Sequence, residues 1–97
     1  MTETLALSQR VAIRPDVLAR SVGDETVLLD LASGTYFGLD RVGARVWTLF
    51  QRGVTLGEIC DTLVAEYDVV RDRLETDVLR LTGELHAQRL IDVVDVG

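Results

Sequence analysis

Residues 27–40 read VLLDLASGTYFGLD, and this stretch decides how the first half of the 97-residue chain is interpreted. Side chains alternate in period two through residues 26–31, and residues 35–39 are rich in aromatic and β-favouring types. Ser33-Gly34 lies between the two runs and predicts a turn. Phe37 and Leu39 then share one face of the later strand, with Tyr36 on the other. We expect two antiparallel strands, the second with a single partner.

Toward the N-terminus, residues 17–22 form another strand-like run. Gly23-Asp24 separates it from the next strand, and glycine tolerates the positive φ of a hairpin turn. Before it, Val11–Ile13 is a short apolar run closed by Pro15, which belongs at an edge or an entry to a strand. Residues 1–9 are weakly patterned and predict a loose arm. The first half is therefore expected to be a three-stranded meander.

The second half changes to helical periodicity. Asp40 is a plausible N-cap for a helix over residues 41–51, which Gly53 would end. Thr55 and Glu58 match a capping box that opens a second helix. A third helix opens with Asp72 and Glu75 and runs to about residue 88. The expected apolar stripes are, in turn, Val42, Val46, Leu49 and Phe50 with Trp47 beside them; Leu56, Ile59, Cys60, Leu63, Val64 and Tyr67; and Leu74, Val78, Leu81 and Leu85.

Residues 90–94 form a terminal apolar tail, compatible with a short strand. Strands followed by helices predict an α+β domain that spans residues 1–97. Its arrangement resembles a winged helix-turn-helix, with a three-stranded antiparallel sheet followed by three helices.

Net charge argues against nucleic acid as a partner. The ten basic residues are all arginine, and sixteen acidic residues bring the formal charge to −6. Residues 71–89 contain four arginines and four carboxylates, so the expected recognition helix has no net positive charge. Positive charge supplies most DNA affinity. The apolar runs are too short for a membrane span, and no secretory signal is visible. We expect a cytoplasmic protein that binds neither nucleic acid nor membrane.

The sequence offers little for catalysis. Cys60 is the single cysteine and falls on an apolar stripe, where cysteine usually behaves as a small hydrophobe. His86 is the single histidine, so a Cys/His nucleophile pair would have to consist of Cys60 and His86. Gly34 and Gly38 do not precede a helix and make no phosphate loop. We expect no catalytic residue, metal site or cofactor.

An interaction module fits these features better. An unpaired strand edge invites a strand from another chain, and peptide recognition by strand addition uses such an edge. Gly38 within the strand indicates either a bulge or a close approach by another backbone. On the third helix, Asp77, Arg80 and Glu84 share one flank, while Leu79 and Gly83 should point largely away. A solvated charged face is the alternative for that flank.

Several motifs in fixed order give the chain a family resemblance. They are residues 27–40, Gly43, Val46-Trp47, Gly53, Thr55 with Glu58-Ile59, Tyr67, and Asp77-Val78 with Leu81 and Leu85. Together they resemble the PqqD-like family, the recognition elements of ribosomally made, post-translationally modified peptides. The Tyr36-Phe37 pair and Trp47 look most like the stand-alone B1 proteins of lasso-peptide biosynthesis. Asp40 stands where the family commonly has Asn, and both residues cap helices well.

The resemblance implies a non-catalytic protein that binds the leader segment of a precursor peptide as an added strand. It implies that the leader is then presented to a separate leader peptidase and an ATP-dependent cyclase. Carried over onto this sequence, the binding residues are Thr35, Tyr36, Phe37, Gly38 and Leu39 on the strand and Arg73, Asp77, Val78, Arg80 and Leu81 on the third helix. The charges at Arg73, Asp77 and Arg80 could read complementary charges on the leader.

Two alternatives remain open. One is a peptide chaperone for a radical SAM maturation enzyme, as in PQQ biosynthesis. The other is a winged-helix DNA-binding regulator, which the net charge disfavours.

Overall fold

Five strands and three helices make up the computed structural model, which describes residues 5–94. In chain order the elements are β1 (Arg10–Ile13), β2 (Val17–Val22), β3 (Glu25–Asp30), β4 (Thr35–Leu39), α1 (Arg41–Phe50), α2 (Leu56–Glu66), α3 (Arg71–Ala87) and β5 (Ile91–Val94). The predicted α+β class, with a three-stranded antiparallel sheet and three helices, is confirmed.

The meander forms one sheet in the order β2-β3-β4. Gly23 has a φ of 63°, so the turn between β2 and β3 uses the left-handed region that glycine adopts at little cost. The second turn is built by Asp30, whose carboxylate accepts bonds from the Ala32 amide at 3.1 Å and the Ser33 hydroxyl at 2.8 Å. The two hairpins lie where the sequence places them.

A second sheet, of β1 and β5, was not foreseen as a pairing. The strands are antiparallel, with Arg10 opposite Val94 and Ile13 opposite Ile91. The described part of the expected N-terminal arm, residues 5–9, makes backbone bonds to the start of α2. The Gly57 amide donates to the Leu7 carbonyl at 2.8 Å, and Leu56 donates likewise to residue 9.

The predicted helix caps are confirmed. The Asp40 carboxylate accepts the Gly43 amide at 2.8 Å. At the start of α2, the Thr55 hydroxyl accepts the Glu58 amide at 3.1 Å, and the Glu58 carboxylate accepts the Thr55 amide at 3.0 Å. These bonds satisfy amides that the first turn of a helix leaves without partners.

One core of buried side chains joins the helices to the sheets. It takes Leu28 and Leu39 from the meander, Val11 and Ile91 from the smaller sheet, and one face of each helix. Cys60 is fully buried in this core, and burial raises the pKa of its thiol, as expected of a structural cysteine.

The predicted stripes need two corrections. Val42 lies in the first turn of α1 with 38% of its surface exposed, and Gly43 takes the buried place beside it. An ideal Cβ on Gly43 would lie 3.3 Å from both Leu39 and the Asp40 carboxylate, so a larger residue would require these neighbours to shift by a few tenths of an ångström. Leu79, expected to point away, is half-buried and packs against the core.

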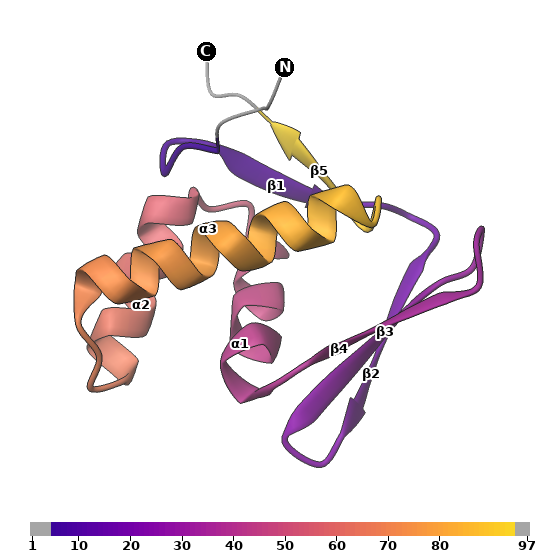
Figure 1. Ribbon diagram of the computed structural model, residues 1–97, viewed down its shortest axis with the longest axis horizontal. Helices are drawn as coiled ribbons and strands as arrows, with labels where there is room; N and C mark the ends of the chain where they lie inside the picture. Colours follow the sequence, from indigo (N-terminus) through magenta and orange to yellow (C-terminus); the bar gives the residue numbers. More distant parts are fainter. Residues whose placement is uncertain (1–4, 95–97) are drawn as a thin grey trace.

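The arrangement leaves β4 beside α3. Figure 1 shows α3 crossing the helical layer, the meander projecting below it, and β1 and β5 side by side above it. β4 leads directly into α1, and β4 and α3 run in roughly opposite directions (Figure 1). No helix among residues 5–94 is long and apolar enough to cross a membrane.

Candidate functional site

β4 is an edge strand, and the hairpin geometry indicates which backbone groups lie on its open side. Among residues 5–94, β4 pairs with β3 alone. The two-residue turn at 23–24 makes Val22 and Glu25 a hydrogen-bonded pair. Because bonding direction alternates along an antiparallel strand, the odd-numbered residues of β3 bond toward β2 and the even-numbered ones toward β4.

The register carries this alternation onto β4. Phe37 lies opposite an even-numbered residue of β3 and therefore bonds to it. Its neighbours Tyr36 and Gly38 direct their N–H and C=O groups toward the open edge. The Leu31 amide donates to the Asp16 carbonyl at 2.9 Å, on the β2 side, as the odd-numbered series requires. The open edge thus presents the donors and acceptors of two residues.

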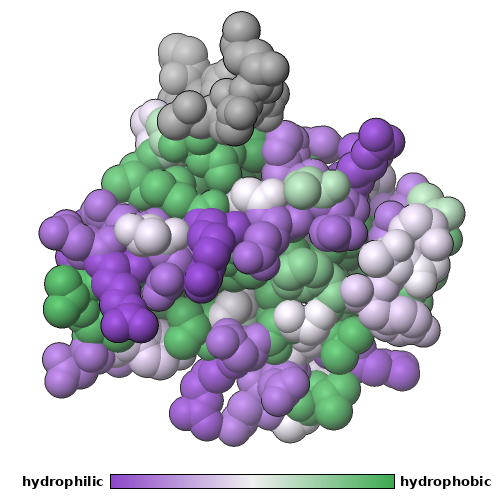
Figure 2. Space-filling model, viewed as in Figure 1, coloured by the Kyte–Doolittle hydropathy of each residue, from purple (hydrophilic) through white to green (hydrophobic). Residues whose placement is uncertain are grey.

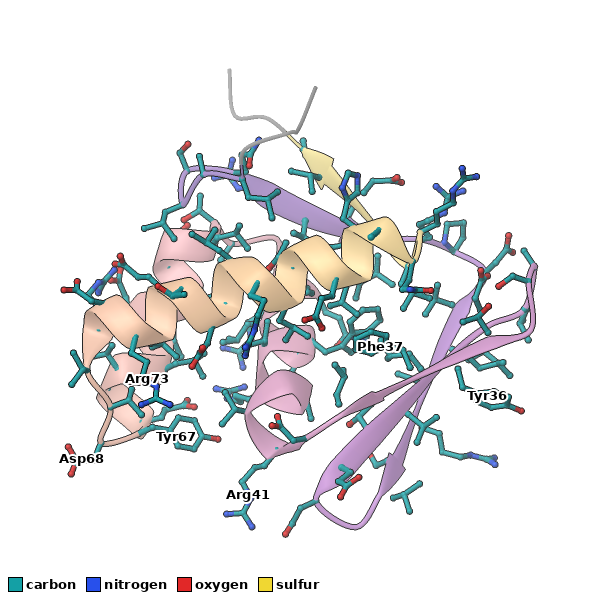
Figure 3. All side chains as sticks on the ribbon, in the orientation of Figure 1. Tyr36, Phe37, Arg41, Tyr67, Asp68 and Arg73 are labelled. Carbon is teal, nitrogen blue, oxygen red and sulfur yellow. The ribbon has the colours of Figure 1, made fainter. Side chains whose placement is uncertain are left out.

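A groove of about 410 Å³ runs between this edge and α3. Phe37, Gly38 and Leu39 form its strand side, the first turns of α1 close one end, and α3 forms the opposite wall. Figure 3 shows Phe37 between β4 and α3, with Tyr36 on the other side of the strand. Apolar and neutral residues lie below the polar ridge of α3 in Figure 2. The groove therefore combines an open strand edge with apolar surface.

Eight of the ten predicted site residues line this one groove, namely Phe37, Gly38, Leu39, Arg73, Asp77, Val78, Arg80 and Leu81. Thr35 and Tyr36 do not line it. Thr35 is half-buried at the start of β4, and Tyr36 is 69% exposed on the opposite face of the sheet. Tyr36 still contributes backbone groups to the open edge. That these residues bind a peptide remains a prediction.

The site predicted from the sequence lacks several lining residues, which are Asp40, Val42, Gly43, Val46, Val69, Leu74 and Glu84. Val42 fits the spacing of the core stripe of α1, and helical periodicity therefore assigned it wrongly to the core. Val69 is 45% exposed, and together with Val70 it forms an apolar pair just before α3 and off every stripe. An apolar pair outside the helical pattern was the signal that could have indicated it.

Three of the charges that line the groove already have partners. Asp77 and Arg80 form an ion pair at 3.5 Å, one turn apart on α3. The Asp40 carboxylate is held by the Gly43 amide at the start of α1. Val78 is buried, so it supports the groove from the core. These contacts leave apolar surface as the main feature of the centre.

Metal ligands and the cysteine are the reactive groups to check in the described residues. No group of three or more His, Cys, Asp or Glu side chains in residues 5–94 could hold a metal ion. Cys60 lies in the core and does not line the groove. The groove offers main-chain bonding, apolar contact and charge.

Comparison with known proteins adds a family. Residues 25–91 match the family model described as coenzyme PQQ synthesis protein D (PqqD). Proteins named PqqA binding protein from two strains of Xanthomonas campestris pv. campestris, 8004 and ATCC 33913, are each 37% identical over 68 residues. That alignment covers 70% of this chain and 72% of each relative.

Two solved structures share the fold. One, described as TbiB1 in complex with the TbiA(beta) leader peptide, is 41% identical with a TM-score of 0.78, over 84% of this chain and 94% of that one. The other, lasso peptide synthetase B1 complexed with the leader peptide, is 25% identical with a TM-score of 0.79, over 86% and 98%. Both neighbours were solved with a leader peptide bound.

Proposed function

Since this chain belongs to the PqqD family, we propose that it recognises the leader segment of a ribosomally made precursor peptide. The leader adds as a strand to the open edge of β4 and lies in the groove against α3. One structural neighbour is named lasso peptide synthetase B1, and both were solved with a leader peptide, which supports a lasso-peptide pathway. The protein has no catalytic part in this proposal.

The observation that carries the proposal is the open edge beside an apolar groove. Tyr36 and Gly38 offer main-chain donors and acceptors, which give affinity in strand addition. Phe37, Val42 and Leu81 offer apolar surface on one side of that edge. Alternate side chains of an added strand would face this surface, which supplies specificity.

Presentation of the bound leader to processing enzymes extends the proposal. The face of the meander that carries Tyr36 lies opposite the groove. A peptide held at the edge would therefore keep its outward side chains accessible. We propose that a separate leader peptidase and an ATP-dependent cyclase act on the precursor in this complex. A peptidase assay with and without this chain tests that step, and an unchanged cleavage rate would contradict it.

Isothermal titration is the direct test of recognition. The probe is a synthetic peptide that corresponds to the leader half of the precursor encoded by the nearest short gene. It is titrated at low and at high salt. Binding with a Kd of about 1 μM or below, or roughly −8 kcal/mol, is expected. Its salt dependence should be modest, because main-chain bonds and apolar contacts carry it. No binding at high micromolar peptide would contradict the proposal.

The curated relatives favour a second candidate, recognition of a PQQ precursor for a radical SAM maturation enzyme. They are named for binding PqqA and are 37% identical to this chain. A synthetic PqqA peptide in competition with the lasso-type leader separates the two. Displacement of the lasso-type leader by an equal concentration of PqqA peptide would favour the PQQ pathway. A large excess of PqqA peptide that displaces no leader would favour the lasso pathway.

A further inference from the structure

Two charges at the ends of the groove have no partner, although those between them do. Arg73 and Glu84 both line the groove and are exposed. Neither takes part in an ion pair or a side-chain hydrogen bond with any residue between 5 and 94. By contrast, Asp77 and Arg80 between them neutralise each other at 3.5 Å. The α3 wall of the groove therefore carries one cation and one anion that no ion pair neutralises, whereas the Asp40 carboxylate across the groove is held by the Gly43 amide.

The two charges lie in one row of α3. They lie eleven positions apart in the sequence, which corresponds to about 16 Å along the helix and about 20° around its axis. Arg73 lies toward the N-terminal end of α3 in Figure 3, and Phe37 lies beneath its later turns. Arg73 thus marks the end of the groove where β4 leads into α1, and Glu84 marks the other end.

An extended peptide in this groove meets both charges. A strand rises about 3.4 Å per residue, so 16 Å spans about five residues. Only alternate side chains face the groove, which limits the spacing to even numbers. A spacing of four suits side chains as long as those of arginine and glutamate, which can close the remaining gap.

On these grounds we propose that Arg73 and Glu84 select a peptide with an acidic and a basic side chain about four residues apart. The acidic side chain lies against Arg73 and the basic one against Glu84, with apolar groove-facing residues between them. This inference rests on the proposed leader recognition and specifies its substrate class. Arg73 and Glu84 are the specificity-determining residues, and the Asp77–Arg80 pair is the neutral centre.

The charge order also sets the direction of the peptide. β4 and α3 run in roughly opposite directions (Figure 1). A peptide antiparallel to β4 therefore reaches Arg73 with its earlier residues, so its acidic residue precedes the basic one. In a parallel peptide the basic residue comes first.

Charge reversal with rescue is the test. The variants are Arg73→Glu and Glu84→Arg, and the probes are the synthetic leader and versions of it with single charges reversed. Each substitution should also suit the helix macrodipole, with an acid near the N-terminus of α3 and a base near its C-terminus, so folding should be retained. Arg52→Glu and Asp16→Arg are controls with the same charge changes at exposed positions outside the groove.

We expect each groove variant to weaken binding of the unmodified leader by about threefold to tenfold at low salt. Reversal of one acidic leader residue should restore binding to Arg73→Glu, and reversal of one basic residue should restore binding to Glu84→Arg. The controls should stay within twofold of the unmodified chain.

Three results would overturn the inference. Unchanged affinity of both groove variants would show that these charges do not contact the peptide. If the groove variants bind the leader more weakly and no charge-reversed leader restores the affinity, the substitutions act indirectly and not through contact with the leader's charges. In both cases the unmodified chain still binds the leader, so recognition itself stands. Failure of the unmodified chain to bind any of the leaders would remove the proposed function and this inference together.

Discussion

The start of α2 and the border between β4 and α3 contrast within one small protein. At the start of α2, the capping box closes the first turn, and Leu56, Ile59, Cys60 and Leu63 are buried. At the border, β4 has one partner strand, and Val42 and Val69 remain partly exposed beside the groove. The first region has its polar groups paired and its apolar groups covered. The second keeps both available.

This difference separates residues that hold the fold from residues that are free to bind. A small domain depends on most of its apolar side chains for stability, so apolar surface left uncovered calls for an explanation. At the groove, Val42 and Val69 leave such surface next to unpaired backbone groups of a strand edge. The following predictions test whether stability and binding divide along this line.

Truncation of the core should have the largest effect. Trp47 is 4% exposed and packs edge-to-face on Phe50, with ring centroids 6.1 Å apart. Trp47→Ala should lower the free energy of unfolding by about 3–5 kcal/mol because it leaves a cavity. Denaturant unfolding measures this loss. A midpoint shift that corresponds to less than about 1 kcal/mol would contradict the assignment of Trp47 to the core. Leader affinity of the folded fraction should not change, because Trp47 does not line the groove.

Removal of one main-chain donor at the open edge should abolish leader binding with little change in fold. Gly38→Pro deletes the N–H that faces outward, and proline is tolerated at strand edges where that N–H faces solvent. We expect affinity to fall by about a hundredfold or more, while helical circular dichroism is retained. Titration calorimetry gives the affinity.

Gly38→Ala is the matched control for this change. Alanine keeps the N–H, and an ideal Cβ at this position meets no atom within 4 Å. It should therefore bind the leader much more tightly than Gly38→Pro. Equal affinity of the alanine and proline variants would rule out main-chain bonding at Gly38.

A smaller effect is expected from the apolar surface of the groove. Val42→Ala removes two carbon atoms from a residue that is partly exposed and lines the groove. At about 0.8 kcal/mol per buried methylene the upper limit is about 1.6 kcal/mol, and because Val42 is already partly buried in the free protein, leader affinity should fall roughly threefold to tenfold. Val94→Ala is the control, since Val94 is also partly exposed and lies on β5 away from the groove. Similar affinity of both variants would place the leader elsewhere.

The smallest expected effect is on the pH dependence of stability, through the capping box at the start of α2. The hydrogen bond from the Thr55 amide is the main cause that lowers the pKa of Glu58 from its ordinary value of 4.5. A lowered folded-state pKa contributes stability that is present above pH 4.5 and lost as the pH falls through the folded-state pKa. Stability of the unmodified chain should therefore drop in acid, and Glu58→Gln should make the dependence shallower.

Unfolding midpoints at pH 7 and pH 3 measure this effect. Glu66→Gln is a useful companion, because the hydrogen bond from Arg45 likewise lowers the pKa of Glu66. The double variant should be shallower still. An unchanged pH dependence in Glu58→Gln would show that the capping box does not act through the ionised carboxylate. Leader affinity at neutral pH should not respond to either change.

Local signals predicted most of the fold. The hairpin at Gly23-Asp24, the cap at Asp40 and the capping box at Thr55 each depend on residues within a few positions, and all three are confirmed. The site was predicted in part, because edge strand and helix flank could be assigned separately. Val42 was misplaced since helical spacing alone does not tell where along α1 the core ends.

The sequence by itself determined the class, the turns and caps, and the family, since these depend on short-range periodicity and motifs in fixed order. Only the tertiary structure decided that β1 pairs with β5 from the far end of the chain. It also decided that β4 and α3 border one groove, with Asp77 and Arg80 paired and Arg73 and Glu84 left over. Such relations depend on how whole elements pack, and packing brings together residues whose separation along the chain carries no local signal.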